Sequence, residues 1–182
     1  ARYSYVSDIY HNRHKAKVID FPLAYHISFH CYGTRLPGDP DGSVRKQQNL
    51  PGTLSIPHSP SRMRSNKKRM NQQPYSLNEK ERAIVVSAIR EVCDFRRWEL
   101  IAAHVRSTHV HVVVFATCKP EKVLNDFKSY ATRALRREGL ITEDQEVWSR
   151  HGSTRYKWTD DNVASAVEYV VFQQGEMMEV FQ

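Results

Sequence analysis

Alternating apolar and polar residues predict three β-strands in this chain. In the first, over residues 21–32, an apolar side chain recurs at every second position: Tyr25, Ile27, Phe29 and Cys31. The second is expected over Trp98–Arg106 and the third over His109–Thr117. Only Ser107 and Thr108 separate them, which predicts a hairpin. The segment 109–115 is apolar on both faces, so we expect this strand to be central and buried.

Three segments show the 3.6-residue period of helices instead. Ser76 and Glu79 have the spacing of a capping box, which predicts a helix from there to about Phe95. A second helix is expected from Pro120 to about Glu138, and a third after Thr159. Residues 148–158 between them predict a loop with a short edge strand. This order indicates an α+β fold: a ferredoxin-like or RNA-recognition-like antiparallel sheet with helices on one face.

One segment interrupts this pattern. Residues 33–75 begin with Gly, Pro and Asp, continue with little periodicity, and carry a cluster of basic residues. We interpret them as an irregular basic insertion that lies over the surface of a single domain spanning residues 1–182. The basic cluster is a candidate DNA contact and consists of Arg62, Arg64, Lys67, Lys68 and Arg69.

Composition narrows the class of protein. The chain has 27 Lys and Arg against 20 Asp and Glu, a net charge of +7, which favours a polyanionic partner. No apolar run reaches the roughly 20 residues that a membrane helix needs. The three cysteines follow no zinc or disulfide pattern, which indicates a reducing cytoplasm. We therefore expect neither a membrane protein nor a disulfide-stabilised secreted one.

The candidate chemistry lies on the third strand and the last helix. His109 and His111 are two residues apart, so both imidazoles project from one face of the strand and could hold one divalent cation. Tyr169 and Gln173 are one helical turn apart and share a face. Together they offer three neutral metal ligands and a phenol, a set suited to cleaving a phosphodiester. Tyr130 is a competing nucleophile, although its spacing favours core packing.

Further basic and aromatic residues are candidates for contacts with DNA. They are Lys128, Arg133, Arg155 and Tyr156. Lys128 and Arg133 could almost equally well form a solvated basic face of their helix. For Tyr156 the alternative is packing under the last helix.

Three segments resemble the single-tyrosine HUH transposases. They are His109-Val-His111, the helix segment 127–135, and Glu168-Tyr-Val-Val-Phe-Gln173. The opening segment 25–39 is similar to the subgroup of REP-associated tyrosine transposases, and the resemblance covers about residues 21–175.

This resemblance implies roles for four residues. His109, His111 and Gln173 would bind Mg²⁺ or Mn²⁺, and Tyr169 would form a 5′-phosphotyrosine intermediate. The substrate would be single-stranded DNA beside a hairpin, and the location the nucleoid of a bacterial cytoplasm. In some members the tyrosine helix of one subunit completes the site of another, so a homodimer and a chain acting alone both stay open.

Two other classes of function are open at this stage. One is a non-catalytic nucleic-acid-binding module, against which the third strand counts because it lacks exposed aromatic residues. The other is a replication-initiator or relaxase-type HUH nickase, with the same chemistry in another process.

Overall fold

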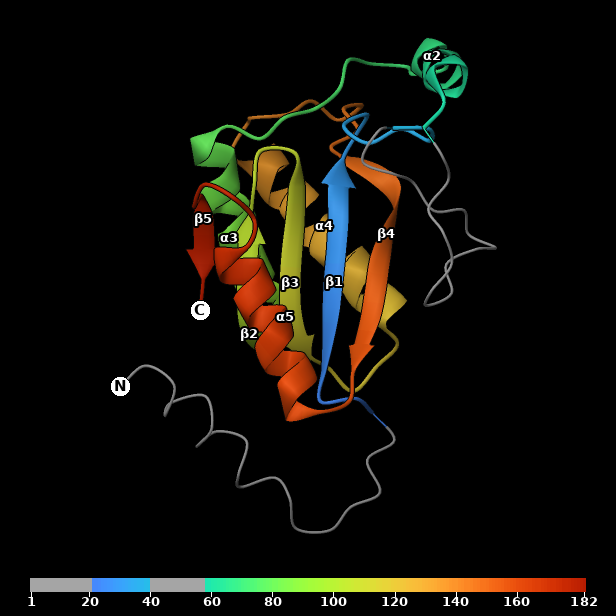
Figure 1. The fold of residues 1–182 in the computed structure, drawn as a ribbon. Helices are drawn as coiled ribbons and strands as arrows, with labels where there is room; N and C mark the ends of the chain where they lie inside the picture. The colour runs from blue at the N-terminus through green and yellow to red at the C-terminus, as the bar shows by residue number, and fades with distance from the viewer. Residues whose placement is uncertain (1–20, 40–57) are drawn as a thin grey trace.

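The computed structural model describes residues 21–39 and 58–182. A five-stranded antiparallel sheet forms its centre, in the order β4-β1-β3-β2-β5 (Figure 1). The strands are β1 Ala24–Cys31, β2 Glu99–Val105, β3 His109–Phe115, β4 Trp148–Lys157 and β5 Glu179–Phe181; the helices are α2 Pro60–Lys68, α3 Glu79–Arg96, α4 Pro120–Arg137 and α5 Asp160–Phe172. The predicted α+β class and ferredoxin-like sheet are confirmed, with β3 at the centre.

The larger core lies between the sheet and two helices. Tyr25, Ile27 and Phe29 of β1 project toward α3 and α4, together with Val110 and Val112 of β3. All five side chains are at most 2% exposed. The alternation predicted for the first strand is therefore confirmed, and it places this face of β1 in the core.

Helix α5 corrects one part of the fold prediction, because it covers the opposite face of the sheet. In Figure 1 it crosses in front of β2 and β3, whereas α3 and α4 lie behind the sheet. Val163, Val167 and Val170 of α5 pack on Ala102 and Val113, which project from this second face. Because β3 is apolar on both faces, burying it requires a helix on each side.

At one edge of the sheet the predicted edge strand is present but longer than expected, and at the other edge lies a strand that was not predicted. The segment after Trp148 forms a ten-residue strand, β4, paired with β1 along most of its length. At the other edge β5 pairs with β2, although its three residues are too few to show an alternating pattern. The length of β4 and the presence of β5 both depend on pairing with a neighbouring strand, which their own sequences do not reveal.

Helix α3 begins two residues later than the predicted capping box. Its N-cap is Asn78, whose side chain accepts a hydrogen bond from the backbone N–H of Glu81 at 2.9 Å. Glu81 in turn accepts from the backbone N–H of Asn78 at 2.7 Å and from the hydroxyl of Tyr75. The buried contact with Tyr75 distinguishes this pattern from the overlapping one at Ser76.

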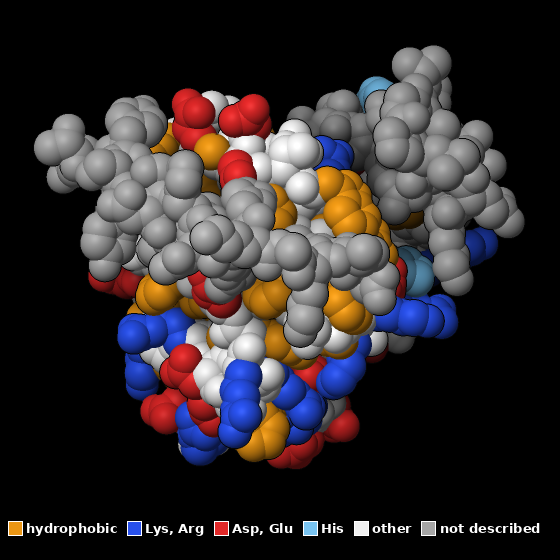
Figure 2. All heavy atoms as spheres, turned by 90° about the horizontal axis from the view of Figure 1, so that it is seen from below, with side chains coloured by type: hydrophobic (Ala, Val, Ile, Leu, Met, Phe, Trp, Pro, Cys, Tyr) orange, Lys and Arg blue, Asp and Glu red, His pale blue; other side chains and the backbone are white. Residues whose placement is uncertain are grey.

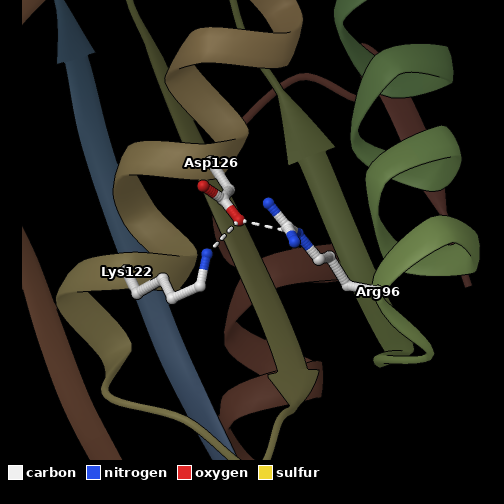
Figure 3. A network of polar contacts seen from close by, with 3 residues as sticks. All are labelled: Arg96, Lys122 and Asp126. Atoms are coloured by element: carbon white, nitrogen blue, oxygen red, sulfur yellow. Dashed lines mark hydrogen bonds and ion pairs between the residues drawn. The ribbon is translucent and has the colours of Figure 1, made fainter.

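A small network of charges joins α3 to α4 at the surface (Figure 3). The carboxylate of Asp126 lies 2.8 Å from the ammonium of Lys122 and 3.1 Å from the guanidinium of Arg96. Partly exposed ion pairs of this kind contribute about 1 kcal/mol or less each. The apolar core, rather than this network, holds the two helices on the sheet.

The expected insertion contains a helix, α2, capped by the side chain of Ser59. Residues 40–57 of the insertion, and residues 1–20 of the expected domain, lie outside the described residues. None of the helices in the described ranges is long and apolar enough to cross a membrane.

Candidate active site

The two histidines of β3 project from the sheet face that α5 covers. The ring centroids of His109 and His111 are 5.1 Å apart, and the ring planes are nearly perpendicular. Burial, with smaller contributions from the neighbouring His109 and His26, lowers the pKa of His111 to about 2. Burial also lowers the pKa of His109, with a smaller effect from the nearby charge of Arg106. At neutral pH both rings are therefore uncharged, and each has one nitrogen with a free lone pair.

Tyr169 of α5 lies beside this pair. Its ring centroid is 5.7 Å from that of His111, with the ring planes at 89°. The Tyr169 side chain is 41% exposed, so a substrate can reach it. The tyrosine and both histidines belong to one chain, and the apolar contacts of α5 with β2 and β3 bring them together.

The two glutamines that follow α5 have different contacts. Gln173 is the C-cap residue, is exposed, and donates from its side-chain amide to Glu168 at 3.4 Å. The side chain of Gln174 donates to the backbone carbonyl of Tyr169 at 3.1 Å and lies near enough to His109 to raise the pKa of that imidazole. The structure thus brings Gln174, which we did not predict, to the histidines. The role of Gln173 as a ligand stays a prediction.

Two histidines of β1 also lie at the site and were missed in the sequence. The Nε2 atom of His26 lies 3.2 Å from Nδ1 of His111, and the ring centroid of His30 lies 5.3 Å from that of His109. The pKa of both is lowered to about 4, mainly by burial, with a smaller contribution from the charges of Lys157 and Arg155 at His26. The signal was present, because alternation places residues 26 and 30 on the face opposite Tyr25 and Phe29.

His104 of β2 is a structural residue at the base of the site. It is fully buried, and its Nδ1 lies 2.9 Å from the carbonyl oxygen of Val170 while its Nε2 accepts from the backbone N–H of Met178 at 3.2 Å. Burial lowers its pKa. The neutral ring satisfies one of the carbonyls left unpaired at the end of α5 and ties the segment before β5 to the sheet.

The donor set fits a divalent cation bound by two imidazoles and an amide oxygen. Among the described residues, no group of three or more His, Cys, Asp and Glu side chains is placed to hold a metal. The neutral rings of His109 and His111 could supply two ligands to a cation, and a third protein ligand would be of another type. A glutamine at the end of α5 offers such a ligand through its amide oxygen.

Basic residues of β4 lie on the same sheet face as the site. Arg155 is paired with His26 in the β1–β4 register, and its side chain is exposed. Lys157, two residues further on, projects from the same face; burial and the nearby Arg155 lower its pKa. The end of the molecule seen in Figure 2 shows basic and acidic side chains interspersed, so the net charge of +7 is not gathered there. Arg155 is thus one predicted DNA contact that lies on the same face of the sheet as the candidate site.

The other predicted DNA contacts lie elsewhere. Figure 1 shows α2, with its basic residues, beyond the end of the sheet at which β1 ends. On α4, Lys128 donates to two carbonyl oxygens of β4, at 2.8 Å and 3.1 Å, and burial lowers its pKa to about 8. Arg133 lies over the ring of Tyr130 at 4.4 Å on the same helix. Tyr156 projects to the core-side face of the sheet, against Tyr25 at 5.2 Å.

Tyr130 does not share the site with the histidines. It lies on α4, on the other side of the sheet from α5, and is partly buried against the larger core. Packing is therefore its observed role, as its spacing predicted.

The chain is similar to known transposases. The family model described as "Transposase IS200 like" matches residues 67–173, more than half of the chain. No curated protein matches. Among solved structures, a REP-associated tyrosine transposase bound to a REP hairpin is similar, at 11% identity and a TM-score of 0.46. The alignment covers 87% of this chain and 72% of the chain of that structure. A provisionally assigned transposase from Deinococcus radiodurans R1 is similar at 10% identity and a TM-score of 0.43, covering 86% and 94%. The match to the family model alone assigns the family.

Proposed function

This chain belongs to the IS200-like transposase family, and on that premise we propose that it cleaves and rejoins single-stranded DNA through Tyr169. The observation that carries the proposal is the 5.7 Å distance between the ring centroids of Tyr169 and His111, in one chain and with the Tyr169 side chain 41% exposed. The family also favours a transposase over a replication initiator or a relaxase. By the sequence resemblance, the substrate is DNA beside a hairpin, and the protein acts at the bacterial nucleoid.

Tyr169 would be the nucleophile of the reaction. The phenolic oxygen of Tyr169 loses its proton and bonds to the scissile phosphorus, while the bond from phosphorus to the 3′ oxygen breaks. This leaves a 5′-phosphotyrosine and a free 3′-hydroxyl. A second 3′-hydroxyl can attack the phosphotyrosine and release Tyr169, so strand joining needs no further energy source.

His109 and His111 would hold Mg²⁺ or Mn²⁺, with Gln173 or Gln174 as the amide ligand. The bound cation would supply Lewis-acid stabilisation of the charge on the phosphate. The spacing from Tyr169 favours Gln173, whereas the position beside His109 favours Gln174. Arg155 lies on the same sheet face, where it can bind a phosphate of the incoming strand.

The test is a denaturing-gel assay with hairpin oligonucleotides from the flanks of the gene, labelled at either end, in Mn²⁺ or EDTA. We expect a metal-dependent adduct that retains the 3′ label, and its loss in Tyr169→Phe. Tyr130→Phe is the matched control, because it removes the same hydroxyl on the other side of the sheet and should leave the adduct unchanged.

Two outcomes would contradict the proposal. An adduct that persists in Tyr169→Phe and disappears in Tyr130→Phe would move the nucleophile to α4. Binding of hairpin DNA with no adduct under any condition would indicate a non-catalytic DNA-binding module.

A further inference from the structure

Three aromatic rings are in mutual contact where α5 meets β1 and β3. The ring centroid of His26 is 5.4 Å from that of His111 and 5.7 Å from that of Tyr169. The ring centroids of His111 and Tyr169 are also 5.7 Å apart. His26 is only 8% exposed, so it contacts the proposed nucleophile and a proposed metal ligand from inside the protein.

The cross-strand register explains this arrangement. Ser28 is directly opposite His111 in the β1–β3 pair, and His26 is opposite Val113. His26 and His111 are thus diagonal neighbours on one face, a separation that long or aromatic side chains can span. Their nitrogen atoms meet in the 3.2 Å hydrogen bond between Nε2 of His26 and Nδ1 of His111.

The direction of this hydrogen bond decides whether His111 can bind a metal. A neutral imidazole carries one proton, so one nitrogen donates and the other has the free lone pair. If His26 donated from Nε2, the proton of His111 would be on its own Nε2, and neither nitrogen of His111 could bind a cation. If His111 donates from Nδ1, its Nε2 lone pair is free.

We propose that His26 is a positioning residue, whose Nε2 accepts the Nδ1 proton of His111 and so leaves Nε2 of His111 for the metal, while its ring supports the ring of Tyr169. This inference rests on the function proposed above. A metal-binding histidine almost always has a hydrogen-bond partner on its second nitrogen, which fixes its tautomer and orientation. His109 has such a partner as well, because its Nδ1 lies 3.0 Å from the hydroxyl of Thr108.

His30 offers a matched control on the same strand and face. Its ring centroid is 5.3 Å from that of His109, much as His26 lies beside His111. Its Nε2, however, is hydrogen-bonded to Arg35 at 3.3 Å. Replacing His30 therefore removes a neighbouring ring without removing the hydrogen bond to His111.

The first measurement is the tautomer of His111 in the metal-free protein, from side-chain ¹H–¹⁵N NMR spectra. We expect a protonated Nδ1 on His111 and an unprotonated Nε2, and the opposite assignment would overturn the inference. The His111 Nδ1 proton should exchange faster with water in His26→Phe, and remain as in the native protein in His30→Phe.

The second measurement is Mn²⁺ affinity, by titration with electron paramagnetic resonance. His26→Phe keeps a ring but removes the acceptor, and should weaken Mn²⁺ binding by about 10–100-fold. His26→Gln keeps an acceptor but removes the ring, and His30→Phe keeps the acceptor of His26, so both should stay within about threefold of native. An affinity for His26→Phe equal to that of the native protein would overturn the positioning role.

Failure of the inference and failure of the proposed function give different results. If the native protein bound no Mn²⁺, or if Tyr169→Phe still formed the adduct, the proposed function would be wrong. If the native protein binds Mn²⁺ and all four proteins bind it equally, only the role of His26 would be wrong.

Discussion

Replacing His104 with leucine should destabilise the end of α5, the helix that carries Tyr169. The substitution removes the partner of the Val170 carbonyl oxygen, at 2.9 Å, and of the Met178 backbone N–H, at 3.2 Å. A buried polar group that loses its hydrogen bond costs about 1–3 kcal/mol. Met178 is partly exposed and can regain water, so we expect the free energy of unfolding to fall by about 2–4 kcal/mol.

Thermal and urea unfolding measure this effect directly. For a chain of this length, each kcal/mol corresponds to about 2–4 °C, so Tm should fall by roughly 5–15 °C. His151→Leu is the matched control, because His151 is exposed on β4 and its side chain should contribute within about 0.5 kcal/mol. Equal stability of His104→Leu and the native protein, or an equal loss in both variants, would refute the structural role of His104.

His26 and His30 have a pKa of about 4 in the folded protein against an ordinary value of 6.5, so the unfolded chain binds more protons below pH 6.5. The free energy of unfolding in EDTA should therefore fall as the pH is lowered from 6.5 toward 4, by roughly 2 kcal/mol per histidine at pH 5, and a flat profile would contradict these shifts. Because Gln174 lies beside His109, Gln174→Ala should weaken Mn²⁺ binding more than Gln173→Ala, and calorimetric titration giving the reverse order would return the ligand role to Gln173. Gly152→Ala should lower the free energy of unfolding by about 1–3 kcal/mol, since the added Cβ would lie 2.7 Å from a backbone oxygen of β1; native thermal stability would show that β4 can shift.

The sequence predicts the parts of this fold that have their own periodicity. β1, β3, α4 and α5 each repeat apolar residues over two or more turns or alternations, and all four are present. β5 has three residues, and β4 mixes small, polar and aromatic residues, so both depend on pairing with a neighbouring strand. The N-terminus of α3 required a choice between two overlapping capping patterns, which the buried contact between Tyr75 and Glu81 distinguishes.

The candidate site was predictable only in part, for a related reason. His109, His111 and Tyr169 stand in recognisable spacings, and the structure brings them together. His26 lies 85 residues before His111, and its role depends on the pairing of β1 with β3, which no local spacing encodes. The contact of Gln174 depends on where α5 ends, and the observed end at Phe172 places Gln173 outside the last turn.

The pairing of β1 with β3 also affects how folding errors would appear. Because successive strand residues face opposite sides, a slip of one residue would turn the imidazoles of β3 toward α3 and α4 and its valines toward α5. Valines would then occupy the side of the sheet that carries the candidate active site, in a molecule that still holds most of its apolar surface inside. A misregistered fraction would therefore escape detection by size or by helix content, and would appear only as inactive protein in a titration of active sites.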